Sequence, residues 1–216
     1  MNKISKDYFT ASIIKWYKKN GRSFPWRYNS DIYQVLVSEL LLQKTDAPKV
    51  ETVFYDFFSK FKTIEDINKA KTKDIEKILF PIGLYKNRAN RLKTIAQKIL
   101  EDYSGEIPSN KDDLLQLKGV GNYIANAVLC FGYGKPEPIL DTNIIRIYNR
   151  LFEVKSTKKR PRTDKEIWNF ANSMLPKDKV QDYNYAVLDY ASLICKARKP
   201  LCVNCIFSKY CFNKQL

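Results

Sequence analysis

The 216-residue sequence contains no histidine. This absence excludes a histidine-based catalytic triad, a histidine-liganded zinc hydrolase and a Cys2His2 zinc finger. Nor does any apolar segment approach the ~18 residues that a membrane-spanning helix needs. The N-terminus is polar and shows neither the apolar core nor the cleavage site of a signal peptide. We therefore expect an intracellular protein of the cytoplasm or nucleoid, with no membrane partner and with cysteines kept reduced.

Acidic residues are few compared with basic ones. The sequence has 38 Lys and Arg against 23 Asp and Glu, which gives a formal net charge of +15. This excess is larger than solubility requires and is typical of proteins that bind polyanions, nucleic acid first among them. A genome that favours lysine codons would produce a similar composition, so charge alone leaves both explanations open.

Apolar residues recur at helical spacing along almost the whole chain, and strand-like alternation is scarce. The segments TIED at positions 63–66 and TDKE at positions 163–166 predict capping boxes at helix N-termini. Glycine and proline groups interrupt the pattern at short intervals, and there is no internal repeat. The sequence predicts an all-α fold of roughly ten short helices joined by short loops.

Four of the five cysteines lie near the C-terminus, at Cys195, Cys202, Cys205 and Cys211. In a reducing compartment, thiols so closely spaced indicate a metal centre rather than disulfides. Four thiolates suit either zinc or a four-iron four-sulfur cluster. The fifth, Cys130, stands in an apolar helical segment and is expected to be a buried structural thiol.

A short glycine turn separates two predicted helices in the segment LLQLKGVGNYIA. The first helix is expected to end at Leu117 and the second to begin near Asn122. The glycines permit a tight hairpin, and the backbone N–H groups that follow can bind a phosphate, although many such turns are only connectors. Further along, Asp141 fits the N-cap of a helix over 143–150 as well as a functional carboxylate.

Combined, the hairpin glycines, Asp141 and the cysteine spacing resemble the helix-hairpin-helix DNA glycosylases of the endonuclease III type. Four further blocks carry the likeness over nearly the whole chain: FPWR (24–27), VSELLLQKT (37–45), IGLYKNRANRL (82–92) and YNYAVLDYASLIC (183–195). The mismatch-specific branch is most similar, the thymine/guanine enzymes first and the adenine/guanine enzymes second. The resemblance implies a two-lobed fold, with a six-helix lobe 25–133 that contains the hairpin and a discontinuous lobe 1–24 plus 134–216, and with DNA bound at their junction.

The resemblance also implies the residues that carry the reaction. Asp141 would stabilise the cationic sugar that forms as the base departs. Glu39, on an otherwise apolar helix, would contact the extruded base as a proton donor or hydrogen-bond partner. Family members that also nick DNA carry a lysine at the position of Tyr123, so a Schiff base is not expected and the enzyme should leave an intact abasic site. Tyr123 would instead face the flipped nucleotide, unless it is a core tyrosine.

DNA contacts and the cofactor are implied in the same way. Gln43 and Lys44 would fill the space left in the duplex or touch the opposite strand. The expected phosphate contacts are Lys118, Gly119, Val120, Gly121, Arg146, Arg198 and Lys199. Each of the cations among them could equally be a solvated surface charge. The four C-terminal cysteines would hold one 4Fe-4S cluster that braces the basic loop 195–211 against DNA.

These observations predict a monomeric mismatch-specific glycosylase that acts on double-stranded DNA and removes thymine or uracil opposite guanine. The chain ends soon after Cys211, whereas adenine-specific members generally continue into another domain, and this favours the thymine or uracil reading. Gln43 is a residue type shared with the adenine-specific members, so removal of adenine opposite guanine or 8-oxoguanine is the alternative. A non-catalytic helix-hairpin-helix DNA-binding module is the alternative of another class, and the sequence does not decide between repair and a restriction-linked pathway.

Overall fold

The computed structural model describes residues 3–28 and 31–212, and the regular secondary structure within these residues is entirely helical. The chain divides into two compact units. Unit 1 consists of Met1–Arg22 and Pro136–Leu216, and unit 2 consists of Ser23–Lys135. No helix in the described ranges is long and apolar enough to cross a membrane. The predicted all-α class is confirmed, while the predicted lobes 25–133 and 1–24 with 134–216 stay a prediction, because packing alone does not establish independent folding domains.

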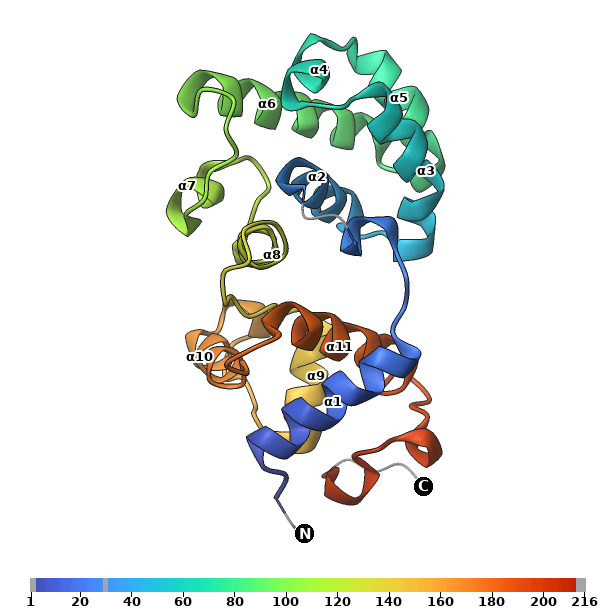
Figure 1. Cartoon of the computed structure of the whole chain (residues 1–216), viewed down its shortest axis with the longest axis vertical. Coiled ribbons are helices and arrows are strands. Elements are labelled where there is room, and N and C mark those ends of the chain that lie inside the picture. The colour runs from blue at the N-terminus through green and yellow to red at the C-terminus, as the bar shows by residue number, and fades with distance from the viewer. Residues whose placement is uncertain (1–2, 29–30, 213–216) are drawn as a thin grey trace. The chain divides into compact units, whose positions relative to one another are not determined.

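Unit 1 is built around α1 and α11, which lie side by side (Figure 1). Its elements are α1 (Lys6–Asn20), α9 (Thr142–Phe152), η4 (Pro161–Thr163), α10 (Lys165–Ser173), α11 (Val180–Leu193), η5 (Cys202–Asn204) and η6 (Ser208–Tyr210). Aromatic rings fill the core: the Phe9 ring of α1 lies 5.2 Å from Phe152 and 5.0 Å from Phe207. These rings connect the first helix to α9 and to the C-terminal segment.

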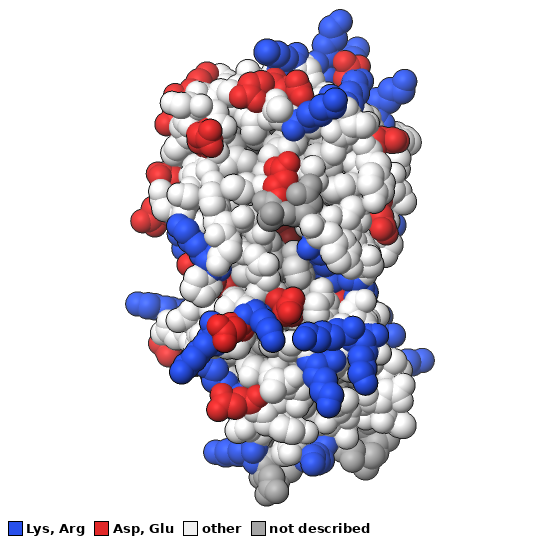
Figure 2. All heavy atoms as spheres, in the orientation of Figure 1, with Lys and Arg blue, Asp and Glu red and all other residues white. Residues whose placement is uncertain are grey.

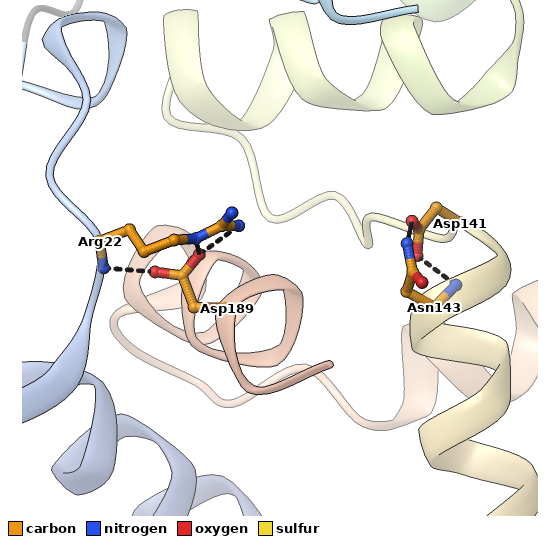
Figure 3. Close-up of polar contacts among 4 residues, drawn as sticks. All are labelled: Arg22, Asp141, Asn143 and Asp189. Atoms are coloured by element: carbon orange, nitrogen blue, oxygen red, sulfur yellow. Dashed lines mark hydrogen bonds and ion pairs between the residues drawn. The ribbon is translucent and has the colours of Figure 1, made fainter. Parts of the chain in front are cut away.

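An ion pair with a buried carboxylate fixes the segment that follows α1 to α11. The carboxylate of Asp189 is fully buried, and it accepts hydrogen bonds from the Arg22 backbone N–H at 2.7 Å and from Arg22 Nε at 2.8 Å (Figure 3). A buried carboxylate is costly unless a charged donor compensates it, and Arg22 does so here. Asp189 therefore holds the segment after α1 against α11 within unit 1.

Unit 2 surrounds the apolar helix α2, in which the side chains of 33 and 35–41 are buried. Its elements are η1 (Pro25–Arg27), α2 (Ile32–Leu42), α3 (Ala47–Lys60), α4 (Ile64–Lys69), α5 (Thr72–Leu79), η2 (Phe80–Ile82), α6 (Tyr85–Asp102), α7 (Lys111–Gln116), α8 (Asn122–Ala127) and the π-helical turn η3 (Val128–Gly132). Helix α2 packs against α3, α8 and η3, so its buried residues form the centre of the unit.

One of the two predicted capping boxes is confirmed and the other is wrong. The Thr63 hydroxyl accepts a hydrogen bond from the backbone N–H of Asp66, and the Asp66 carboxylate accepts one from the backbone N–H of Thr63. At 163–166, however, Asp164 is the N-cap of α10 and accepts from the Glu166 backbone N–H at 3.1 Å. Thr163 belongs to η4 and its hydroxyl donates to the carbonyl of Arg160. Ser156 donates to the Asp164 carboxylate at 2.5 Å, which favours this charged acceptor as the cap.

Basic side chains gather on the surface of unit 1. Figure 2 shows Lys and Arg clustered over the C-terminal half of α1, where Lys15, Lys18 and Lys19 are exposed. The opposite face of the same helix buries Phe9 and Ile13. Helix α1 thus turns an apolar face to the core and a basic face to solvent.

Candidate active site

Asp141 is held rigidly at the start of α9 in unit 1. Its Oδ1 accepts the backbone N–H groups of Asn143 at 2.9 Å and Ile144 at 2.8 Å, and its Oδ2 accepts the Asn143 side-chain amide at 2.6 Å (Figure 3). The N-cap geometry predicted for this residue is therefore present. A carboxylate offers about four lone-pair positions, so these donors fix its orientation and still leave room for a further donor. The residue is half-buried.

A chain of hydrogen bonds runs from Asp141 to the first of the four clustered cysteines. The Asn143 side-chain oxygen accepts from Arg146 Nη1 at 2.9 Å, and Arg146 Nε donates to the carbonyl of Cys195 at 2.9 Å. The remaining Arg146 nitrogen, Nη2, donates to the carbonyl of Ala191 at 2.9 Å. The phosphate contact predicted for Arg146 stays a prediction. In the structure the same side chain joins α9 to the end of α11 and to the start of the cysteine-rich loop.

The four C-terminal cysteines line one pocket of unit 1. The pocket is small, with a cavity volume of about 20 Å³, and its wall also includes Arg150 and Tyr190. Arg150 Nη1 lies 3.3 Å from the sulfur of Cys195, and the Tyr190 hydroxyl donates to the sulfur of Cys205 at 3.1 Å. Such donors are the outer-shell contacts that metal-bound thiolates accept.

Chemically, these four side chains fit a group with four sulfur ligands. Burial raises the pKa of the Cys205 thiol, which the hydrogen bond from Tyr190 partly opposes. Within the part of the chain that the structure describes, no three Cys, Asp or Glu side chains are arranged to hold a metal ion. The four cysteines therefore share a pocket and accept hydrogen bonds at sulfur without being arranged as ligands, and a cofactor at this place is supported by the chemistry of the side chains alone.

The glycine hairpin of unit 2 joins α7 to α8, as the sequence predicts. Gly119 has φ of +83°, a left-handed conformation that glycine adopts readily and other residues adopt at a cost. Val120 is buried and anchors the turn, whereas Lys118, Gly119 and Gly121 are exposed. The phosphate contacts expected of these residues stay predictions, and their exposure leaves them accessible.

Gln43 follows α2 and contacts the hairpin directly. Its Nε2 donates to the carbonyl of Gly119 at 3.0 Å, and its Oε1 accepts from Nη1 of Arg91 on α6. The residue after α2 and the glycine hairpin, which the sequence predicts separately as DNA contacts, are therefore joined by a hydrogen bond in unit 2. Lys44, the next residue, is exposed and has φ of 57°.

Arg88 closes the C-terminal end of α2 from within the unit. Only 5% of this residue is exposed. Its nitrogens donate to the Thr45 hydroxyl and to the carbonyls of Leu40, Leu41, Gln43 and Gly83. Burial lowers the pKa of Arg88, and the charge of Arg91 lowers it further, yet a guanidinium stays charged in proteins.

Sequence reasoning missed both arginines, although one signal was present. Arg88 stands on the same face of α6 as the buried Leu92 and Ile95, so a cation interrupts an apolar stripe. Glu39 interrupts the apolar face of α2 in the same way. For Arg91 no comparable signal exists, because its contact with Gln43 depends on tertiary packing.

Glu39 is a buried carboxyl group in the middle of α2. The residue is 5% exposed, and its Oε2 has no hydrogen-bond partner within residues 3–28 and 31–212. Burial raises the pKa of Glu39 to about 7, against the opposing charge of Arg27. A carboxyl group with that pKa is neutral for much of the time near neutral pH and can donate a proton.

The other predicted functional residues lie on both units. Tyr123 is half-buried in α8 and, like Glu39, belongs to unit 2, whereas Asp141 belongs to unit 1. Arg198 and Lys199 are exposed in the cysteine-rich loop, where Lys199 has φ of 50°. Cys130 is fully buried in η3, as expected of a structural thiol.

Comparison with known proteins places this geometry in a family. Residues 37–173 match the model of the HhH-GPD superfamily base excision DNA repair protein. A thymine/uracil-DNA glycosylase of Pyrobaculum aerophilum is 40% identical over 91% of this chain and 87% of its own length. An adenine DNA glycosylase of Buchnera aphidicola subsp. Acyrthosiphon pisum is 32% identical over 96% of this chain and 59% of its own length. The solved structure of a thermostable thymine-DNA glycosylase superposes with a TM-score of 0.90 at 36% identity, covering 96% of this chain and 95% of the other.

The chain belongs to the HhH-GPD superfamily of base excision DNA repair proteins. The predicted family and its likeness to the thymine/guanine mismatch-specific members are confirmed. The similarities support a mismatch-specific DNA glycosylase, as the sequence motifs predict.

Proposed function

We propose that this protein removes thymine or uracil paired with guanine in double-stranded DNA and leaves an intact abasic site. The observation that carries the proposal is the fixed carboxylate of Asp141, held by three N–H donors at the start of α9. The relatives named for thymine and uracil support the choice of base. The excess of positive charge supports DNA as the partner, and an intracellular location stays a prediction.

Hydrolysis would begin with departure of the base. The electrons of the N-glycosidic bond leave with the base, and positive charge builds on the deoxyribose. Asp141 would stabilise that charge and accept the proton of the water that attacks the anomeric carbon. Because the carboxylate is already oriented by Asn143 and Ile144, little reorganisation is needed when the charge appears.

Glu39 would interact with the departing base. Its pKa of about 7 supports a role as a proton or hydrogen-bond donor to the extruded base.

Tyr123 would face the flipped nucleotide. Since the second position after Gly121 carries a phenol and not an amine, no Schiff base can form there, and we propose that the enzyme has no lyase activity. Trapping with borohydride should therefore yield no covalent adduct with DNA, and such an adduct would contradict the role of Tyr123.

The four cysteines would hold one 4Fe-4S cluster. When bound, this group would supply a rigid cross-link of the loop 195–211 and no chemistry of the reaction. The loop would then present Arg198 and Lys199 to the DNA backbone. Iron and acid-labile sulfide are measured on protein purified without oxygen; four irons per chain are expected, whereas stoichiometric zinc would contradict the cluster.

A panel of duplexes tests the substrate. Thymine, uracil and adenine are each placed opposite guanine, and adenine is also placed opposite 8-oxoguanine, with strand cleavage scored before and after alkali. Release of thymine and uracil, visible only after alkali, is the expected result. Cleavage without alkali would contradict the monofunctional mechanism, and no release from the thymine and uracil duplexes would contradict the substrate.

The same assay separates catalysis from binding alone. Asp141→Asn keeps the shape of the side chain and removes its charge, so base release should fall by about a hundredfold or more, as expected when a group that stabilises a charged transition state is lost. A non-catalytic DNA-binding module would bind the duplex and show no release in either form. Equal release by both proteins would show that Asp141 is not the catalytic carboxylate.

Removal of adenine is the second candidate, and Glu39 is the observation that favours it. A carboxyl group that is neutral near pH 7 is suited to protonating a purine, which becomes a better leaving group when protonated. Gln43, a residue type shared with adenine-specific members, points the same way. Release from the adenine duplexes, with thymine and uracil retained, would establish this function instead.

A further inference from the structure

Three turns of unit 2 meet around two arginines of α6. Each turn carries a residue in the left-handed backbone region: Lys44 with φ of 57°, Leu84 with φ of 52° and Gly119 with φ of 83°. For a residue other than glycine this conformation costs roughly 1–2 kcal/mol, so other contacts must maintain it. Arg88 binds the turns at 43–45 and 83–84, and Arg91 binds Gln43 and lies against Gly119.

The side-chain amide of Gln43 is fixed at both of its ends. Its oxygen accepts from Arg91, and its nitrogen donates to the carbonyl of Gly119 at 3.0 Å. Because a guanidinium only donates and a carbonyl only accepts, the two partners define which end of the amide is oxygen and which is nitrogen. One N–H and one oxygen lone pair of Gln43 remain, and they form an ordered donor and acceptor pair.

The guanidinium of Arg91 also packs closely against the hairpin. A Cβ atom placed on Gly119 would lie 3.0 Å from both Cδ and Nε of Arg91. The absence of a side chain at Gly119 is thus what lets the arginine lie against the turn while it reaches Gln43. Arg91 is half-buried and therefore holds a defined position, unlike a freely solvated surface cation.

We propose that Arg91 is a positioning residue that sets the orientation of the Gln43 amide and thereby the preference for the base opposite the excised one. This inference rests on the proposed function, and it takes the role that the family resemblance implies for Gln43, which is to fill the space left in the duplex or touch the opposite strand. Arg91 acts through Gln43: without it only the Gly119 carbonyl orients the amide, so the amide turns over more readily and a donor can replace the acceptor that the opposite base would meet. Binding of DNA in general, through the phosphates, does not require this orientation.

Four variants test the proposal: Arg91→Ala, Arg91→Lys, Gln43→Ala and the Arg91→Ala/Gln43→Ala double variant. Binding is measured to duplexes that carry an abasic site opposite each of the four bases, alongside single-turnover release of thymine opposite guanine. Arg91→Ala should reduce the preference for guanine about threefold to tenfold, the range that one hydrogen bond supports. Arg91→Lys should restore part of it, because lysine can donate to Gln43 but lacks the planar fork.

The double variant shows whether the two residues act together. If Arg91 works through Gln43, removing Arg91 in the Gln43→Ala background should leave the preference unchanged. The control is Lys98→Ala, which removes one positive charge from the same helix at an exposed ion pair with Asp102. This control should show the wild-type preference, and thermal unfolding of every variant confirms that it is folded.

Equal weakening of binding to all four duplexes, additive with Gln43→Ala, would overturn the proposal and identify Arg91 as a phosphate contact. An unchanged preference in Arg91→Ala would also overturn it, as would a wild-type protein with no preference at all. Failure of the proposed function is seen separately, as the absence of base release from thymine and uracil duplexes by the wild-type protein. The abasic duplexes still report the role of Arg91 in that case.

Discussion

At the scale of single residues, Glu39 combines burial with ionisable chemistry. Its pKa of about 7 lies above the ordinary value of 4.5, so the folded state disfavours the carboxylate. The unfolded chain loses the proton as pH rises through 4.5, while the folded protein keeps it until about pH 7. The unfolded state therefore binds fewer protons across this window, and stability falls as pH rises through it.

The first prediction concerns this pH dependence. Glu39→Gln removes the titration, so its free energy of unfolding relative to the wild type should rise by roughly 3 kcal/mol between about pH 4 and pH 8. Urea unfolding at both pH values measures the difference. Glu106→Gln, at an exposed position of the same unit, is the control and should show no such change. A constant difference across the range would contradict the raised pKa.

The residues of the site could be predicted to different degrees. The N-cap position of Asp141 and the spacing of the cysteines are short local patterns, and Glu39 interrupts an apolar helical face, so their places are visible in the sequence. Their roles in the reaction are implied by the family resemblance and stay predictions. Arg91 and Tyr190 act on partners far away in the chain, Gln43 and Cys205, and nothing in their local sequence shows it. Their contacts exist only because helices pack in a particular way.

At the scale of elements, helix α9 connects Asp141 to the cysteine-rich loop through Arg146. Replacing Arg146 with alanine removes donors to Asn143, Ala191 and Cys195. We expect a loss of about 2 kcal/mol of stability, because hydrogen bonds from charged donors are strong. Single-turnover base release well below the unfolding temperature should fall with little change in affinity, since Asn143 then holds Asp141 less firmly.

A control in the same unit separates this effect from loss of charge. Arg162→Ala removes an exposed cation from η4 and should leave both base release and stability at the wild-type level. If Arg146→Ala weakens DNA binding and leaves the rate of bound complexes unchanged, then Arg146 is a phosphate contact, as the sequence first indicated.

The hairpin between α7 and α8 gives a third prediction. Gly119→Ala introduces a side chain at positive φ and against Arg91, so it should cost about 1–2 kcal/mol in stability and also weaken DNA binding. Gly134→Ala is the matched control, because Gly134 has φ of 69° and no heavy atom near the new Cβ. Gly134→Ala should show only the cost of the positive φ in thermal unfolding, and Gly119→Ala should show at least that cost. Equal DNA binding by the two would show that the Gly119 contact is unimportant.

Most helices could be predicted from the sequence because caps and apolar spacing are local. Thr63 and Asp66 form the expected box, and the hairpin helices end and begin within a residue of their predicted positions. The cap of α10 could not be predicted, because Ser156 favours Asp164 over its neighbour through a loop contact. The π-helical turn η3 likewise has no local signal and depends on packing against α2.

At the scale of the whole molecule, the net charge of +15 should dominate affinity for DNA. We expect the logarithm of the binding constant to fall with the logarithm of salt concentration with a slope of about −3 to −5, as several phosphates are neutralised. Lys118→Gln should reduce the magnitude of that slope by about one and leave the preference for the mismatch unchanged. Arg162→Gln serves as the control, and a slope near zero for the wild type would contradict the electrostatic mode of binding.

The two crossings of the chain between units also set an order of events during synthesis. The chain leaves unit 1 after Arg22 and returns at Pro136, and the contact between Arg22 and Asp189 spans 167 positions. Unit 2 is continuous, so all the residues that pack within it have been synthesised once Lys135 has been added. Helix α1, with Phe9 and Ile13 on its apolar face, must wait for α11 to emerge. The apolar face of α1 is therefore uncovered in the nascent chain through most of translation. We expect a chaperone to bind the nascent chain at this helix.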